Sequence, residues 1–359
     1  MVPFARACVA AGHEVRVCAP ASFADSVERV GLTHVPVPEP SAAELGAIFA
    51  RLPSLSMEEA NRVVVAEVFG GLDARAALPG VEAAVVSFKP DVLVREMAEF
   101  ASFVVARRFD VPQVEISIGL AEMDVAAYGM VGDALARLGC PDGVQELCSS
   151  PLVSLVPESL DGVPDRPVHR FRYEPPPSTA RGVPEWPGAT DDPVVYASFG
   201  TVAASIGLFP DGYRALVDAV ADLPVRMLLT VGESGDPDEL GPTPAHVLVE
   251  RFWPQQDVMP HARAMIGHGG FGTTMTGLAN GVPMVVVPLF ALDQFCNARA
   301  VERAGAGVVA ELSDVSEALA RILRDDSYRT AARRLAAEIA ALPPASGSAD
   351  VLVRAALDG

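Results

Sequence analysis

Short stretches in which polar and apolar residues alternate recur along the chain, and helical patterns lie between them. In the first half, residues 14–19, 91–95 and 113–117 alternate as half-buried strands do. Residues 3–11 and 98–109 carry helical patterns. Strands that alternate with helices in this way predict a parallel sheet with crossover helices.

The pattern stops at residues 173–192 and then restarts. Two proline-rich runs in this stretch disfavour both a helix and a central strand, so it is predicted to be a linker. The strands expected after it are residues 193–200, 225–230, 247–250, 264–266 and 284–288. The last of these is fully apolar and is predicted to be a central strand. The helices expected after the linker include residues 315–323, 331–341 and 349–357.

Length and composition narrow the class of protein. The chain has 359 residues, which suggests two domains, and half of them are hydrophobic. The 27 basic and 46 acidic side chains give a net charge of −19, which argues against nucleic acid or anionic lipid as a partner. The most apolar stretch, residues 282–292, is too short to insert across a membrane. None of the five cysteines forms a Cys-x-x-Cys pair, which indicates reduced thiols, a cytoplasmic protein and no metal cluster.

A glycine-rich segment, His-Gly-Gly-Phe-Gly-Thr-Thr at residues 268–274, directly follows a predicted strand and precedes a helix predicted at residues 275–280. Glycines let the backbone approach a ligand closely, and a helix N-terminus offers free N–H groups and a positive dipole end. Together they predict a phosphate or diphosphate site. A plain turn is the alternative, because the segment matches neither a Walker loop nor the Rossmann glycine pattern.

Two other turns carry side chains of interest. Asp293 and Gln294 lie in a loop after the apolar strand, where they could bind the hydroxyls of a polyhydroxylated ligand or cap a helix predicted at residues 295–304. Phe252 and Trp253 lie in a turn after the strand at residues 247–250, where they could stack on a nucleobase or belong to the core.

These segments occur in a fixed order. It runs from Phe-Trp-Pro-Gln at 252–255 through the glycine-rich segment, Gly-Val-Pro at 281–283, Asp293-Gln294 with Asn297, to Gly-Ala-Gly at 305–307. The order and spacing resemble the nucleotide-sugar-binding half of family 1 glycosyltransferases of the GT-B fold, most of all the actinobacterial enzymes that glycosylate antibiotics. The resemblance implies an α/β protein with two Rossmann-like domains whose parallel sheets face each other across a cleft. The parts would be an acceptor-binding domain 1–172, a linker 173–192, a nucleotide-sugar-binding domain 193–343, and a closing helix 344–359 that packs back on the first domain.

The resemblance also implies roles for single residues. Phe252 would stack on the base, with Trp253 as the near alternative, and Gln255 would offer its backbone groups to the base. The glycine-rich segment would hold the diphosphate, and Asp293 with Gln294 would bind sugar hydroxyls. The donor-binding residues would be Thr201, Phe252, Trp253, Gln255, His268, Gly269, Gly270, Gly272, Thr273, Asp293 and Gln294. No metal and no cofactor is implied, because a helix N-terminus holds the diphosphate charge and the nucleotide sugar is a substrate.

Position 276 indicates which nucleotide is used. UDP-sugar users of the family have a glutamate there, which binds both ribose hydroxyls, whereas this chain has Thr276. A short hydroxyl side chain cannot make that two-point contact, and thymidine nucleotides lack the 2′-hydroxyl. The donor is therefore predicted to be a dTDP-sugar, with a deoxyhexose as the expected sugar.

The chain begins where the family's first helix is already under way. The resemblance therefore implies that a first strand and the loop carrying the catalytic base are missing from it. Glu96 matches the acidic partner of that base, with Glu99 one helical turn further on. An ordinary acid at a helix N-terminus is the alternative for Glu96. His13 matches a structural histidine of the family and is not the base.

The implied reaction is a direct displacement at the sugar's anomeric carbon, which inverts its configuration. Apolar loops at residues 39–55 and 115–143 would shape the acceptor pocket, which suggests a small hydrophobic natural-product aglycone. Three interpretations stay open: a hexosyl-type glycosyltransferase whose start is set too late, a catalytically silent nucleotide-sugar-binding partner protein, and another GT-B enzyme such as an epimerase. Association into a homodimer stays open as well.

Overall fold

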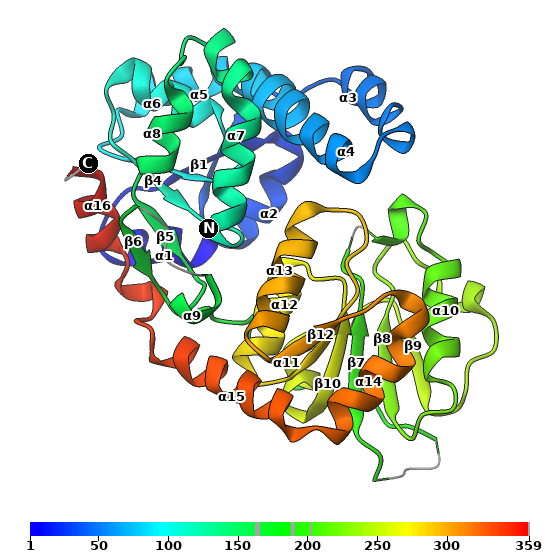
Figure 1. The fold of residues 1–359 in the computed structure, drawn as a ribbon. Helices are drawn as coiled ribbons and strands as arrows, with labels where there is room; N and C mark the ends of the chain where they lie inside the picture. The colour runs from blue at the N-terminus through cyan, green and yellow to red at the C-terminus, as the bar shows by residue number, and fades with distance from the viewer. Residues whose placement is uncertain (162–165, 188–190, 202, 358–359) are drawn as a thin grey trace. The chain divides into compact units, whose positions relative to one another are not determined.

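The computed structural model of the chain describes residues 1–161, 166–187, 191–201 and 203–357 (Figure 1). They form two compact units. Unit 1 comprises Met1–Val156, Gly162–Arg172 and Leu342–Gly359, and unit 2 comprises Pro157–Asp161 and Tyr173–Ala341. Residues 188–190 of the predicted linker lie outside the described residues.

The described strands of unit 1 form two parallel sheets rather than the one that the sequence predicted. The first pairs β1 (Arg16–Pro20) with β2 (Thr33–Val37). The second has the order β3 (Leu93–Glu96), β4 (Gln113–Ile116), β5 (Leu152–Ser154), β6 (Val168–Arg170). Among the described residues β1 and β3 do not pair with each other, and this separates the sheets.

Helices cover the strands of unit 1. They are α1 (Val2–Ala10), α2 (Ala24–Arg29), α3 (Ala42–Phe49), α4 (Met57–Val63), α5 (Ala74–Phe88), α6 (Ala101–Phe109), α7 (Ala121–Arg137), α8 (Gly143–Ser149) and α16 (Ala349–Leu357), with π-helical Val64–Asp73 between α4 and α5. Leu352 of α16 is buried in one hydrophobic cluster with Phe4 of α1 and Ile116 of β4. This burial holds the last helix on unit 1.

The described strands of unit 2 form one parallel sheet. Its order is β12 (Gly307–Val309), β11 (Met284–Val286), β10 (Ala262–Gly267), β7 (Val194–Ser198), β8 (Arg226–Thr230), β9 (Val247–Glu250). The apolar strand β11 lies next to the edge, so the prediction that it is central was wrong. Its residues are apolar because they are buried, which needs covered faces rather than a central position.

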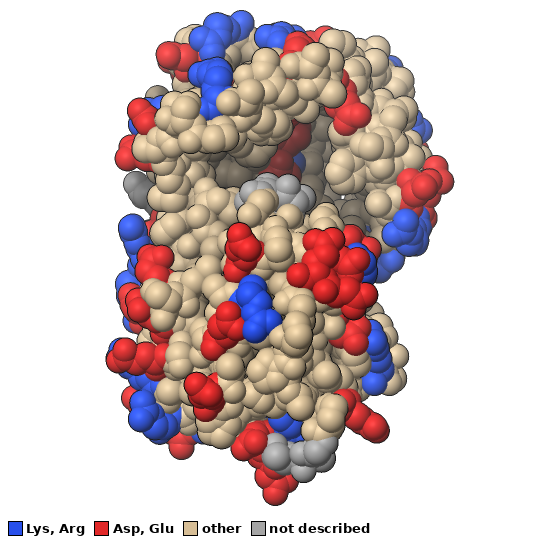
Figure 2. Space-filling view, turned by 90° about the vertical axis from the view of Figure 1, so that its right-hand side faces the viewer, with Lys and Arg blue, Asp and Glu red and all other residues tan. Residues whose placement is uncertain are grey.

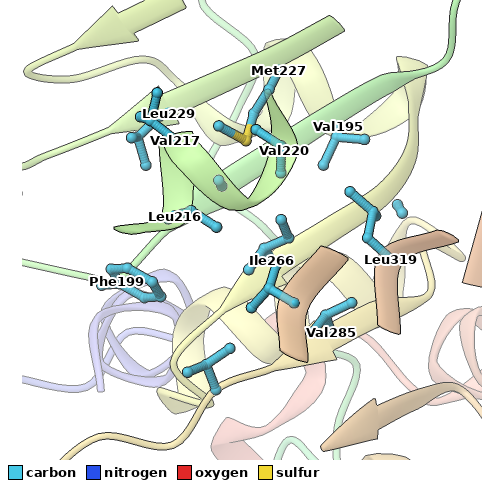
Figure 3. Close-up of a cluster of buried hydrophobic side chains, with 14 of the residues drawn as sticks. Val195, Phe199, Leu216, Val217, Val220, Met227, Leu229, Ile266, Val285 and Leu319 are labelled. Atoms are coloured by element: carbon cyan, nitrogen blue, oxygen red, sulfur yellow. The ribbon is translucent and has the colours of Figure 1, made fainter. Parts of the chain in front are cut away.

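The core of unit 2 lies between this sheet and its helices. Figure 3 shows Val195 of β7 and Ile266 of β10 pointing toward Leu216 and Leu319, which come from two of the covering helices. The helices of this unit are α9 (Glu158–Asp161), α10 (Asp211–Val220), α11 (Gln255–Val258), α12 (Phe271–Ala279), α13 (Leu292–Arg303), α14 (Val315–Arg324) and α15 (Asp326–Ala341). The exposed fraction is 0% for each of these four side chains, Val195, Leu216, Ile266 and Leu319. This cluster is therefore a dry core that fixes the positions of the strand ends.

Several helices begin earlier than the sequence predicted. Helix α12 begins at Phe271 and α13 at Leu292, instead of residues 275 and 295. Gly272, Thr273, Asp293 and Gln294 therefore lie in first helical turns and not in loops. The N–H groups of a first helical turn have no partners inside the helix, so glycine, threonine and acidic residues occur there. These residues carry no apolar periodicity, and the sequence pattern therefore placed the helix starts too late.

The helices and the surface show two further features. No helix in the part of the chain that the structure describes is both long and apolar enough to cross a membrane. On the face in Figure 2, acidic side chains lie interspersed with basic ones.

Candidate functional site

The strand order of unit 2 changes direction between β7 and β10. The chain runs outward from β7 to β8 and β9, and then crosses back to β10 on the other side of β7. From the carboxyl ends of β7 and β10, the chain therefore continues toward opposite edges of the sheet. Parallel sheets bind their ligands at such a point. The structure brings Gly200 so close to His268 that a Cβ on Gly200 would lie 2.7 Å from the imidazole Cε1. Thr201, the next residue, is exposed beside this turn.

The turn after β10 leads directly into α12, with Gly270 as the N-cap. Gly269 has a φ of +88°, and Asn297 fixes its carbonyl through a 2.7 Å hydrogen bond from Nδ2. The N–H groups of Phe271, Gly272 and Thr273 stand in the first turn, where a helix supplies no partners for them. We call residues 268–273 the phosphate turn, because these amides and the helix dipole make an anion site.

His268 is wedged into the phosphate turn. Its ring lies against Gly200 on one side and Gly270 on the other, where a Cβ would come within 2.4 Å of Nε2. Nδ1 is buried and has no hydrogen-bond partner among the described residues. Burial lowers the pKa of His268 to about 4, although a hydrogen bond with the backbone of Ser198 opposes the shift. His268 is therefore neutral at pH 7 without a ligand.

This depressed pKa predicts a defined loss of stability in acid. The unfolded chain binds a proton on His268 below pH 6.5, whereas the folded chain does so only near pH 4. The stability that depends on neutral His268 is complete above pH 6.5 and is lost as the pH falls toward 4, by about 3 kcal/mol in total. Denaturant titrations between pH 7 and pH 4 should show a smaller loss for His268→Asn than for the wild type. Equal losses in the two proteins would contradict the prediction.

A second turn, residues 252–255 after β9, carries the two aromatic side chains, and we call it the base turn. Phe252 is 64% exposed. Trp253 is buried, its Nε1 donates to the carbonyl of Gly182 at 2.9 Å, and the Arg181 guanidinium covers its ring at 3.4 Å. Phe252 is thus the aromatic of this turn that is free to stack on a ligand.

Gln255 begins helix α11 at the end of the base turn and connects it to the phosphate turn. Its Nε2 donates to the hydroxyl of Tyr196 at 3.3 Å and to Oγ1 of Thr273 at 3.4 Å. The sequence predicted a role for the backbone of Gln255, and the contact of its side chain with Thr273 was not predicted. The structure therefore joins the two turns into one site.

Asp293 and Gln294 lie in the first turn of α13. The side-chain Oε1 of Gln294 accepts hydrogen bonds from the N–H groups of Leu289 and Phe290 at 2.8 and 3.1 Å. Its oxygen is therefore occupied by the preceding loop. Burial raises the pKa of the Asp293 carboxyl, while hydrogen bonds with the backbone N–H groups of Gln294 and Asp293 oppose this.

Sequence reasoning missed two residues that connect the predicted linker to this site. The Tyr173 hydroxyl lies 3.1 Å from the carbonyl of Gly272 and 3.0 Å from Oγ1 of Thr276. Asp257 of α11 is 4% exposed and holds the backbone N–H groups of Thr179 and Arg181. No local signal marks either residue, because both contacts join segments far apart in the sequence.

Glu96 ends β3, which belongs to unit 1, whereas the phosphate turn and the base turn belong to unit 2. Its Oε2 accepts a 2.9 Å hydrogen bond from the N–H of Ala98. Burial raises the pKa of Glu96 despite this hydrogen bond. The prediction that Glu99 lies one helical turn after Glu96 was wrong. Glu99 lies before α6, and its carboxylate accepts hydrogen bonds from the N–H groups of Ala101 and Ser102.

A cluster of buried charged side chains is hydrogen-bonded to the backbone of Glu96. Glu115 of β4 is paired with Arg95 at 2.7 Å and with Arg166 at 3.0 Å, and all three side chains are at most 1% exposed. Arg166 also contacts Asp124 at 3.2 Å. Arg95 donates to the carbonyl of Glu96 at 3.2 Å, so the cluster fixes the backbone of the predicted catalytic partner.

Comparison with known proteins agrees with this description of the fold. The family described as UDP-glucoronosyl and UDP-glucosyl transferase matches residues 185–340. The L-demethylnoviosyl transferase of Streptomyces niveus is 31% identical over 96% of this chain and 91% of the relative. The 4'-demethylrebeccamycin synthase of Lentzea aerocolonigenes is 28% identical over 98% and 95%.

Solved structures extend the comparison to the whole fold. The glycosyltransferase SnogD from Streptomyces nogalater is 27% identical with a TM-score of 0.75, over 99% of this chain and 94% of that one. The glycosyltransferase SsfS6 of Streptomyces sp. SF2575, solved with thymidine diphosphate, is 28% identical with a TM-score of 0.73, over 98% and 95%. The fold and the matched relatives thus define a glycosyltransferase with the GT-B fold. The chain belongs to glycosyltransferase family 1, among relatives that are actinobacterial antibiotic glycosyltransferases.

Proposed function

We propose that this protein transfers a deoxysugar from a dTDP-sugar to a hydroxyl of a hydrophobic natural-product acceptor, with inversion at the anomeric carbon. The observation that carries the choice of nucleotide is Thr276. It is buried, and its hydroxyl donates to the carbonyl of Gly272 at 2.8 Å. A carboxylate that would bind two ribose hydroxyls is therefore not supplied at this position, and a 2′-deoxyribose does not need one.

The phosphate turn supports the leaving-group half of the reaction. As the acceptor oxygen bonds to the anomeric carbon, the bond to the nucleoside diphosphate breaks and negative charge grows on the phosphate. The amides of Phe271, Gly272 and Thr273 would take up that charge without a metal ion. Glu96, as a carboxylate, would orient the base that removes the acceptor proton and stabilise its protonated form.

Unit 1 supports a hydrophobic acceptor. The stretches predicted as apolar loops, residues 39–55 and 115–143, are largely helical, since they contain α3 and α7. They still expose large apolar side chains, among them Phe49, Ile118 and Val125, each at least 45% exposed. Such side chains bind apolar ligands because contact removes apolar surface from water.

Relatives support the nucleotide. The TDP-daunosamine transferase DnrS of Streptomyces peucetius is 26% identical over 96% of this chain, and its name states a TDP-sugar donor. The SsfS6 structure contains thymidine diphosphate.

Binding titrations test the donor. We expect dTDP to bind at least about tenfold more tightly than UDP, and EDTA to leave both affinities unchanged. Phe252→Ala should weaken dTDP by about 5-fold to 100-fold, because base stacking on an aromatic contributes about 1–3 kcal/mol. Phe23→Ala serves as the matched control, since Phe23 is a 54% exposed aromatic of unit 1. UDP binding more tightly than dTDP would refute the donor assignment, and an unaffected Phe252→Ala variant would refute the stacking role of Phe252.

A catalytically silent nucleotide-sugar-binding protein is the second candidate. The largest charge effects on Glu96 within the described residues come from Glu99, Arg95 and Glu115, and none of these is a histidine. This candidate predicts dTDP binding without transfer to any acceptor. Incubation with dTDP-sugars and a panel of polyketide acceptors, followed by mass spectrometry, distinguishes the two: a glycosylated product excludes the silent candidate.

A further inference from the structure

The predicted linker is built into unit 2 at its N-terminal end. Residues 173–182, which we call the tether segment, contain no helix or strand and belong to unit 2 from Tyr173 onward. One end of the tether segment is hydrogen-bonded to the phosphate turn, and the other end is hydrogen-bonded to the base turn.

At the first end, Tyr173 contacts the start of α12. Its ring packs edge-on against Phe271, with centroids 6.4 Å apart. Its hydroxyl lies within hydrogen-bond distance of the Gly272 carbonyl and of Thr276 Oγ1, at 3.1 and 3.0 Å. The same carbonyl also accepts from Thr276 Oγ1 at 2.8 Å. Two hydroxyl groups therefore gather on one carbonyl in the first turn of the helix.

This carbonyl shares a peptide group with the N–H of Thr273. A hydrogen bond accepted by the oxygen of a peptide polarises the whole group and makes its N–H a stronger donor. The Thr273 N–H is one of the free amides of the phosphate turn. Tyr173 thus acts on an anion-binding amide through the opposite end of the same peptide.

At the second end, the tether segment is bonded around Asp257. The buried carboxylate accepts from the N–H groups of Thr179 and Arg181, both at 2.9 Å, and from the Thr179 hydroxyl at 2.7 Å. The Ser178 hydroxyl is a further donor. These bonds place the Arg181 guanidinium over the Trp253 ring at 3.4 Å, where its Nη1 also donates to the Phe252 carbonyl at 3.3 Å. Arg181 thereby fixes both aromatic residues of the base turn.

We propose that the tether segment is part of the donor site, with Tyr173 as the positioning residue of the phosphate turn and Arg181 as the positioning residue of the base turn. This inference rests on the proposed function, because it assumes that a thymidine nucleotide occupies the two turns. It adds a division of labour: Tyr173 acts on the diphosphate, and Arg181 acts on the nucleoside.

Thymidine and dTDP separate the two roles, because thymidine lacks the diphosphate. Tyr173→Phe should raise the Kd of dTDP about threefold to tenfold, the loss of one hydrogen bond, and leave the Kd of thymidine unchanged. Arg181→Ala should raise both by a similar factor, about twofold to fivefold. The affinities are measured by calorimetry for dTDP and by ligand-observed NMR for thymidine, with unfolding midpoints of the nucleotide-free proteins alongside.

Two substitutions in unit 2 provide matched controls. Tyr213→Phe removes a buried hydroxyl that has no hydrogen-bond partner among the described residues, and Arg226→Ala removes another arginine that stacks on a tryptophan, Trp186, at 5.3 Å. Both should leave both Kd values unchanged.

The outcomes are distinguishable. A wild-type protein that binds neither dTDP nor UDP overturns the proposed function and this inference together. Wild-type binding with an unaffected Tyr173→Phe, or with equal losses for dTDP and thymidine, overturns the inference alone. If Tyr173→Phe does not fold, Thr276→Val removes the other hydroxyl on the Gly272 carbonyl and must show the same selective loss for dTDP.

Discussion

Gly269→Ala is expected to abolish nucleotide binding, with a loss of dTDP affinity of more than about 100-fold. Gly269 has a φ of +88°, which strains any residue with a Cβ. An added Cβ would also lie 2.6 Å from the carbonyl oxygen of Gln294 and 3.2 Å from its Cα. Both are backbone atoms of α13, so no side-chain rotation relieves the clash, and the phosphate turn must move away from α13.

The same substitution should lower the free energy of unfolding by about 2–4 kcal/mol, from backbone strain and overpacking together. Gly241→Ala is the matched control, because Gly241 also lies in unit 2 with a positive φ of +69°, but a Cβ there has open space. Gly241→Ala should show strain alone and keep dTDP binding. A Gly269→Ala variant that binds dTDP like the wild type would contradict the assignment of this turn to the diphosphate.

Glu115→Gln should give the largest loss of stability, about 3–5 kcal/mol. Glu115 is fully buried and pairs with both Arg95 and Arg166, which are equally buried. A neutral amide leaves both guanidinium groups charged without their shared partner, and a donor amide also faces the Tyr128 hydroxyl, which donates to the carboxylate in the wild type.

Two spectroscopic signals distinguish the unfolding of unit 1 from that of unit 2. Both tryptophans, Trp186 and Trp253, lie in unit 2, so far-UV circular dichroism reports on the whole chain and tryptophan fluorescence reports on unit 2. The dichroism transition of Glu115→Gln should move to lower denaturant. Glu67→Gln breaks an exposed ion pair with Arg51 in the same unit and should have little effect. Equal midpoints for the two variants would show that the buried cluster does not stabilise unit 1.

Most strands and helices were predictable because their signals are local. Strand β9 has the predicted bounds, and β7, β8 and β10 differ by one or two residues at an end. The starts of α12 and α13 were not predictable, because first-turn residues such as Gly272 and Asp293 carry no apolar periodicity. The central place given to β11 was wrong, since apolar composition reports burial and not position in a sheet.

The prediction of the candidate site was similarly uneven. The phosphate turn was predictable because glycines before a helix mark backbone that needs a positive φ, as at Gly269. The resemblance favoured Phe252 over Trp253, whereas the residue types alone did not, because both are aromatic, and only packing buries Trp253 under Arg181. Tyr173 was missed because it meets Thr276 across 103 residues of chain.

The sequence by itself determined which segments become strands, helices and glycine turns, and the family to which their order belongs. These properties depend on neighbouring residues, whose periodicity and backbone freedom are written locally. The tertiary structure alone decided that β10 lies beside β7, which brings His268 against Gly200, and that the tether segment is bonded to both turns. Hydroxyl, amide and guanidinium groups fit many partners equally well, so only the packed fold selects which distant group each one meets.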